Sequence, residues 1–246
     1  MIVRTVTSAV WRSSFSLVAA LAFGSLPASA TTVDLMPGAG SSGTVNGTLF
    51  AFDDQQPLGT GFVDAFLRIQ NNGTEEGYNT SNPSPPFDEI PPPGGFTRDL
   101  QFGELVDIGG SFGFFLDINE PNGGGAALLS LDALQIYVSA TGSQNTTVLG
   151  DLGTLIYDLD AGGDSVVLMD FMNAPGSGVS DMLMSVPSSI FAGVADSDFV
   201  ILYSRFGDTN SSQDGFEEWY AVIPEPGTGL LVALSLTGLG LARRRR

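Results

Sequence analysis

Three carboxylates recur at close spacing in one short segment, at Asp158, Asp160 and Asp164, with two glycines between the last two. Carboxylate oxygens at such spacing can turn towards one hard cation while glycines let the backbone bend around it, so calcium is the candidate ion. An EF-hand is excluded, because Gly162 stands at its third ligand position and Met169 stands where a bidentate glutamate is required. A looser calcium loop remains.

A second interpretation of the same acidic segment needs no ion. Asp and Gly favour tight turns, so the segment also fits a hairpin turn that joins a strand at 154–159 to a strand at 165–171. We prefer the turn and keep calcium as the alternative.

Two further polar groups carry oxygen ligands at alternating positions. They comprise Asp208, Asn210, Ser212 and Asp214 followed by Gly215, and separately Asp117, Asn119 and Glu120. Polar hairpin tips have the same composition, and we expect Asp117 and Asn119 to share the solvated face of a strand. Both groups are therefore weaker calcium candidates than the first.

Aromatic side chains could form a carbohydrate-stacking platform, although filling a core is their more usual role. The candidates are Phe112, Phe114, Phe115, Tyr137, Phe171, Phe199 and Tyr203. A glycosidase that works through a pair of carboxylates is also conceivable, since it needs only two Asp or Glu side chains. The sequence singles out no such pair, and we expect no catalytic residues.

Composition excludes most other chemistry. The chain has no Cys and no His, which removes disulfides, thiol nucleophiles, the usual general base and the commonest transition-metal ligand. Its net charge is −18, it has no Lys, and only Arg68, Arg98 and Arg205 lie between residues 31 and 223. Nucleic acid is therefore excluded as a partner, because phosphate binding needs cationic side chains.

Short β-branched and aromatic runs separated by Gly, Asn, Asp and Ser predict an all-β domain. The expected strands are 45–52, 62–70, 101–108, 112–118, 133–140, 154–159, 165–171, 182–186, 199–206 and 216–222. Strands of this number and length predict a two-sheet β-sandwich, either jelly-roll or immunoglobulin-like. Residues 187–193 are expected to form one short helical turn, and the proline-rich segment 71–95 a long mobile surface loop.

The start of the chain has the three parts of a secretory signal peptide. Arg4 and Arg12 provide positive charge, residues 15–26 are mostly apolar, and Ala28 and Ala30 are small residues at the positions that signal peptidase reads. We predict a signal helix and cleavage after Ala30.

The end of the chain predicts a membrane helix. Residues 227–242 contain no charged side chain and would span about 24 Å as a helix, somewhat less than a hydrocarbon core of about 30 Å. Four cations follow at Arg243, Arg244, Arg245 and Arg246. They should stay on the cytoplasmic side and act as a membrane stop, which places the preceding domain outside.

The triplet Pro224, Glu225 and Pro226 directly precedes this apolar run. A Pro-Glu-Pro triplet, a short membrane helix and an arginine-rich end together resemble the PEP-CTERM sorting signal of Gram-negative bacteria. The resemblance implies processing by exosortase, a membrane cysteine protease, and release or transfer into an extracellular polysaccharide matrix. The same ending occurs on some proteins named for ice binding, and by itself it does not imply ice binding.

Together these observations predict a signal peptide at 1–30, an exported acidic β-sandwich at 31–223 and a sorting signal at 224–246. We expect a non-enzymatic protein of the cell surface or extracellular matrix, structural or adhesive in exopolysaccharide. Its expected partners are signal peptidase, exosortase, the membrane during transit, and exopolysaccharide. The alternatives are a calcium-dependent carbohydrate-binding module and a carboxylate-pair glycosidase.

Overall fold

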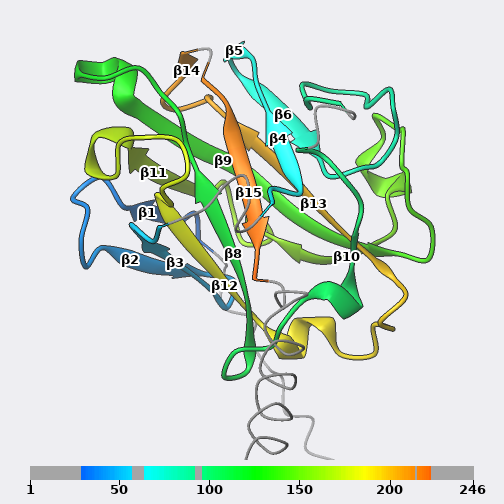
Figure 1. The fold of residues 1–246 in the computed structure, drawn as a ribbon. Helices are drawn as coiled ribbons and strands as arrows, with labels where there is room; N and C mark the ends of the chain where they lie inside the picture. The colour runs from blue at the N-terminus through cyan, green and yellow to red at the C-terminus, as the bar shows by residue number, and fades with distance from the viewer. Residues whose placement is uncertain (1–28, 57–63, 92–95, 214, 223–246) are drawn as a thin grey trace, which may run out of the picture.

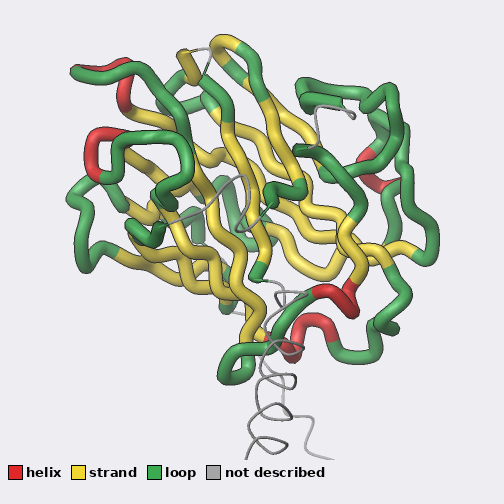
Figure 2. The backbone as a smooth tube through the Cα atoms, in the orientation of Figure 1, coloured by secondary structure: helices red, strands yellow, loops and turns green. Residues whose placement is uncertain are grey.

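The computed structural model describes residues 29–56, 64–91, 96–213 and 215–222, and this part of the chain is built from β-strands and short 3₁₀ turns (Figures 1 and 2). The all-β prediction is confirmed. The predicted signal helix and membrane helix fall almost wholly on residues 1–28 and 223–246, outside the described residues. Within the described ranges, no helix is long and apolar enough to cross a membrane.

The first sheet of the described residues is organised around its longest strand. Its order is β1 (Thr32–Asp34), β11 (Val166–Asp170), β9 (Leu128–Ser139), β13 (Phe199–Phe206) and β6 (Glu75–Tyr78), with β10 (Thr154–Asp158) also on β9 and β7 (Leu100–Gln101) also on β13. The pairings are antiparallel except β1 with β11, which is parallel.

The second sheet is antiparallel throughout. Its order is β2 (Ser42–Val45), β3 (Thr48–Phe52), β12 (Met182–Pro187), β8 (Ser111–Asp117), β15 (Glu217–Ala221) and β4 (Leu67–Ile69). A separate ribbon pairs β14 (Ser212–Gln213) with β5 (Asn72–Gly73), and both lie at the top of Figure 1. Both sheets contribute to one apolar core, so they form the two layers of a sandwich.

The alternation of side chains along each strand produces this core. In β13, Val200, Leu202 and Phe206 face inward, as the period of two in a strand requires. Trp219 of β15 is fully buried between the sheets, and its indole N–H donates to the Ser204 hydroxyl of the opposite sheet at 3.1 Å.

Two of the predicted strands are wrong in detail. Residues 45–52 form a hairpin between β2 and β3, and its turn residues Asn46 and Gly47 have φ angles of 49° and 87°. Asn-Gly is the commonest signal for such a turn, because both residues tolerate positive φ. Residues 101–108 form only the end of β7 before the 3₁₀ turn η1 (Phe102–Glu104).

Other strand bounds shift by a few residues without changing the architecture. The strand predicted at 133–140 begins earlier, as β9, and the strand predicted at 62–70 is shorter, as β4. The helical turn predicted at 187–193 is confirmed as η5 (Ser188–Phe191). The remaining 3₁₀ turns among the described residues are η2 (Gly124–Ala127), η3 (Leu149–Asp151) and η4 (Phe171–Asn173).

The prediction that 71–95 is a mobile surface loop is wrong for its first part, residues 72–78. The segment contributes β5 and β6, and Glu75, Tyr78 and Thr80 are fully or almost fully buried. Glu89 is also buried, and its carboxylate accepts the backbone N–H groups of Tyr78 and Phe87 at 2.9 and 2.8 Å. Residues 92–95 lie outside the described part.

The hairpin predicted across 158–164 is also wrong. β10 pairs with residues 135–138 of β9 and β11 pairs with residues 128–131 of the same strand. Because both run antiparallel along β9, they form one interrupted strand, and the acidic segment is a loop inserted in it.

Candidate functional site

The 158–164 loop satisfies many of its own carboxylate oxygens. Asp158 accepts from the Asp160 backbone N–H at 2.9 Å and from the Gln135 amide at 3.1 Å. Asp160 accepts from the Ser165 backbone N–H at 2.7 Å, while Asp164 is exposed. These are the hydrogen bonds of an Asx-type turn, which positions the loop without an ion.

The Asn46 side chain also attaches the loop to the turn between β2 and β3. The Asn46 amide donates to the carbonyl oxygens of Asp158 and Leu159 at 2.8 and 2.9 Å. Burial, followed by the negative charges of Asp158 and Asp164, raises the pKa of Asp160. Within the described ranges, no group of three or more His, Cys, Asp or Glu side chains is placed to hold a metal ion.

A second acidic region lies between the two sheets. Glu75 of β6 pairs in register with Phe206, a core residue, and therefore projects into the core from the first sheet. Glu217 of β15 alternates with Trp219 and Ala221, also core residues, and projects into the core from the second sheet. Glu75 and Glu217 are 1% and 0% exposed, and their carboxyl groups lie within hydrogen-bonding distance of each other.

Glu120 completes this group, which we call the inter-sheet cluster: Glu75, Glu120 and Glu217. Glu120 follows β8, is 3% exposed, and accepts the backbone N–H of Gln213 in β14 at 2.9 Å. The Ser212 side chain lies beside the carboxyls of both Glu75 and Glu120. Three carboxyl groups from distant parts of the chain thus meet beneath the β5–β14 ribbon.

The inter-sheet cluster lacks hydrogen-bond donors. Glu75 accepts the Asn71 backbone N–H at 2.7 Å through one oxygen only. Among the described residues, the other Glu75 oxygen, one Glu120 oxygen and both Glu217 oxygens have no hydrogen-bond partner. Two ionised carboxylates both accept and neither donates, so the contact between Glu75 and Glu217 satisfies them only when one of the two carries a proton.

Electrostatics in the inter-sheet cluster disfavour ionisation. Burial, followed by the neighbouring carboxyl of Glu75, raises the pKa of Glu217 well above its ordinary value. Burial also raises the pKa of Glu75, and it raises the pKa of Glu120 to about 7.

The weaker calcium groups of the sequence are partly brought together here. Ser212 and Glu120, from separate groups, both belong to the surroundings of the inter-sheet cluster. Gly215 packs so closely on the backbone of Asn119 that a Cβ atom at position 215 would lie 2.1 Å from the Asn119 carbonyl oxygen. Asp208 instead forms an ion pair with Arg205 at 2.9 Å, and Asp214 lies outside the described residues.

Asp117 does not lie on the solvated face of a strand, where we expected it together with Asn119. It is fully buried and accepts the Gly178 backbone N–H at 2.6 Å and the Asn119 amide at 3.0 Å. Nearby Asp181 accepts the Ile118 backbone N–H at 2.8 Å. Burial is the main cause that raises the pKa of Asp117 to about 7 and that of Asp181 to about 9.

The three arginines of the domain are each paired with a carboxylate. Arg68 donates through Nε to Glu218 at 2.7 Å and stacks on the rings of Phe96 and Phe216, at 3.6 and 4.4 Å from their centroids. Arg98 pairs with Glu104 and Arg205 with Asp208, both at 2.9 Å.

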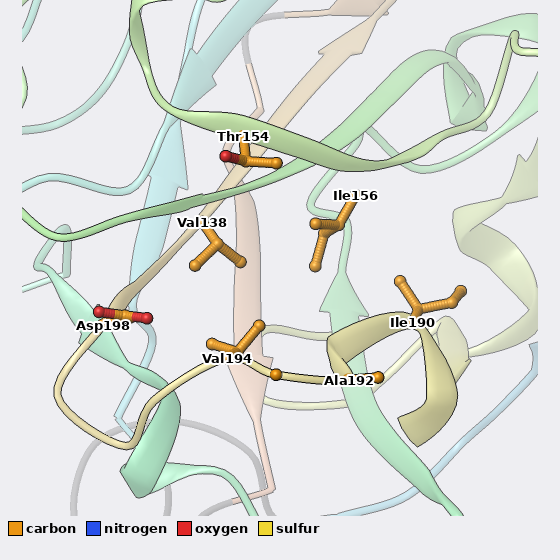
Figure 3. Close-up of a pocket in the computed structure, with 8 residues that line it drawn as sticks. Val138, Thr154, Ile156, Ile190, Ala192, Val194 and Asp198 are labelled. Carbon is orange, nitrogen blue, oxygen red and sulfur yellow. The ribbon is translucent and has the colours of Figure 1, made fainter.

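The aromatic residues proposed for carbohydrate stacking are mostly inside the protein. Phe112, Phe114, Tyr137, Phe171 and Tyr203 are buried, which fits core filling. A cavity of about 280 Å³ lies elsewhere, between β9, β10 and the segment that follows η5 (Figure 3). Its lining is mainly aliphatic, and its single carboxylate, Asp198, accepts the Ala195 backbone N–H at 3.0 Å.

Of the residues predicted for signal cleavage and sorting, only Ala30 lies within the described ranges. Ala30 is exposed, and the next residue, Thr31, donates its backbone N–H to the Ser165 hydroxyl at 3.2 Å just before β1 begins. Other predicted processing residues lie outside the described ranges: Ala28, Pro224, Glu225, Pro226, Arg243, Arg244, Arg245 and Arg246.

Glu75 and Glu217 were missed as site residues for a physical reason. Glu75 lies in a segment whose Asn, Gly and Pro content predicts a loop. Glu217 is the first residue of β15, a strand that the sequence predicts from its apolar residues alone. The usable signal was the pair Glu217-Glu218 directly before Trp219, since one of two successive strand residues must face the core.

Comparison with known families identifies the end of the chain. The family model of the PEP-CTERM protein-sorting motif matches residues 222–246, the segment in which the sequence predicts a sorting signal. No curated protein and no solved structure matched the chain. The chain therefore carries a PEP-CTERM protein-sorting motif at residues 222–246, which indicates an exported protein that exosortase processes.

Proposed function

We propose that the domain at 31–223 is a non-enzymatic protein of the cell surface or the extracellular matrix, with a structural or adhesive role in exopolysaccharide. The sorting motif at 222–246 supports the destination. The observation that favours a non-enzymatic role is the location of the inter-sheet cluster, whose carboxyls are buried between the sheets, out of reach of a polysaccharide.

The glycosidase alternative has less support. Retaining and inverting glycosidases hold two carboxyl groups about 5–9.5 Å apart on either side of the bond they cut. The cavity of Figure 3 has one carboxylate, and the Glu75–Glu217 pair is in direct contact inside the core.

Calcium-dependent carbohydrate binding through Asp158, Asp160 and Asp164 is the second candidate. One observation favours it: the loop interrupts a strand and exposes Asp164 to solvent, where a glycan could reach an ion. Retention of full-length protein on the exopolysaccharide of the producing cells, with calcium and with EDTA, separates the candidates. Retention that requires calcium and is lost in Asp160→Asn favours this binding module over the structural role.

The proposed route involves signal peptidase after Ala30, a pause in the membrane with the arginines in the cytoplasm, and exosortase cleavage near Pro224. Mass spectrometry of the surface or matrix protein tests it. We expect Thr31 at the N-terminus and loss of the four terminal arginines. Replacing Pro224 and Pro226 by alanine should leave uncleaved protein in the membrane, whereas Asp164→Asn should mature normally. Surface protein that still carries Arg246 would contradict the proposed processing.

A further inference from the structure

We propose that the inter-sheet cluster is a calcium site, in which the carboxylates of Glu75 and Glu217 hold the ion between the two sheets and Glu120 adds negative charge at its edge. This site is distinct from the 158–164 loop. It goes beyond the proposed function, because it concerns what stabilises the domain, whatever the domain contacts outside the cell.

The first argument is the surplus of buried oxygens. Within the described residues, both Glu217 oxygens, one Glu75 oxygen and one Glu120 oxygen lack a hydrogen-bond partner. Glu217 is 0% exposed and is directed at Glu75 across the core. A buried carboxylate without donors is costly, so such groups take up a proton, are paired with a charge or coordinate a metal.

The second argument is that the protein provides no cation for these oxygens. The chain has no Lys and no His, and the three arginines of the domain pair with Glu218, Glu104 and Asp208. The neutralising charge for the inter-sheet cluster must therefore come from solution, either as bound protons or as a bound cation.

The third argument concerns the kind of ion. The available donors are carboxylate and hydroxyl oxygens, which calcium prefers, and calcium accepts irregular geometry with six to eight oxygen ligands. In the described part of the chain no three acidic side chains are placed around a metal position. The two carboxylates of Glu75 and Glu217 would therefore be supplemented by water and by nearby oxygens such as the Ser212 hydroxyl, which lies beside Glu75.

The location gives the ion a structural consequence. Glu75 belongs to the first sheet, Glu217 to the second, and Glu120 accepts from Gln213 in the ribbon that covers the cluster. One ion would therefore join both layers and the ribbon in a protein that has no disulfide.

Calorimetric titration and thermal melting of the full chain in detergent, first stripped with EDTA, test the proposal near neutral pH. We expect one calcium per chain with a Kd of about 10⁻⁴–10⁻³ M or tighter, as in extracellular calcium modules. Calcium at about a hundred times Kd should raise Tm by roughly 5–10 °C.

Matched variants identify the site. Glu217→Gln and, independently, Glu75→Gln should fold, since Gln can donate to the remaining carboxylate, but should lose the calcium-dependent rise in Tm. Glu120→Gln should weaken binding by about tenfold, because calcium affinity follows ligand charge. Asp164→Asn, on the exposed loop, should bind as the natural protein does.

Three outcomes would overturn the proposal. The first is no calcium binding by the folded natural chain, which would mean that protons alone neutralise the cluster. The second is magnesium binding in preference to calcium. The third is a calcium response that survives in Glu217→Gln and disappears in Asp164→Asn. None of these results would affect the processing assay, so the two hypotheses fail separately.

Discussion

The 158–164 loop and the inter-sheet cluster are both acidic, but they differ in whether their carboxyl oxygens have hydrogen-bond donors. In the loop, Asp158 and Asp160 accept backbone N–H groups a few residues away, at 2.9 and 2.7 Å. In the inter-sheet cluster, Glu217 is fully buried with both oxygens unpartnered among the described residues. Carboxylates close in sequence can satisfy themselves by forming a turn, whereas the carboxyl groups of the inter-sheet cluster depend on a proton or a cation from solution.

The largest expected effect is a pH dependence of the unfolding free energy. It comes from another buried carboxyl group, Asp181, and extends the comparison to a third acidic site. Its carboxyl faces the negative charges of Asp117 and Asp170 and the N–H of Ile118, and burial raises its pKa to about 9. Its contribution to stability is complete below its unfolded pKa of about 4 and is lost as pH rises through 9, by about 1.4 kcal/mol per pH unit.

Urea denaturation across this pH range measures the effect. Asp181→Asn should flatten the fall in unfolding free energy, because the amide stays neutral and can still accept from Ile118. Stability that increases from pH 5 to pH 9 in EDTA would contradict the assignment of Asp181 as a neutral buried acid.

A smaller effect on the unfolding free energy distinguishes the inter-sheet cluster from the 158–164 loop. In EDTA and at a pH high enough to ionise Glu217, Glu217→Gln should stabilise the folded chain by about 1–4 kcal/mol, because it removes an uncompensated buried charge. Denaturant midpoints of the natural and variant chains measure the difference. Destabilisation in EDTA would mean that the ionised Glu217 already has a favourable partner.

The hydrogen bonds that Asn46 donates to the 158–164 loop should contribute less to the unfolding free energy. Asn46→Gly keeps the positive φ of 49° acceptable but removes both hydrogen bonds to the Asp158 and Leu159 carbonyls. We expect a loss of about 1–2 kcal/mol in unfolding free energy, as for two ordinary hydrogen bonds. Asn46→Asp serves as the control for the turn, since it also tolerates this φ but cannot donate.

The smallest effect is expected at the exposed end of the loop. Asp164→Asn should change the unfolding free energy by less than about 0.5 kcal/mol in either calcium or EDTA. If this variant alone changed the calcium-dependent Tm by several degrees, the ion would be bound by the loop and not by the inter-sheet cluster.

The sequence predicts the fold better than it predicts the interior acids, and particular residues show why. Alternating apolar residues place β13 at 199–206, and Asp158, Asp160 and Asp164 are recognised because they are neighbours in the chain. Glu75 and Glu217 become neighbours only when the two sheets pack. Local composition cannot show that contact, and the Asn and Gly residues around Glu75 predicted a loop in place of β5 and β6.

The most direct test of the central claim is anomalous diffraction from crystals of the full chain grown with calcium. The account predicts a calcium peak between the Glu75 and Glu217 carboxylates, with Glu120 nearby, and none among Asp158, Asp160 and Asp164. A peak confined to the 158–164 loop, or well-ordered Glu75 and Glu217 side chains with no ion between them, would contradict it.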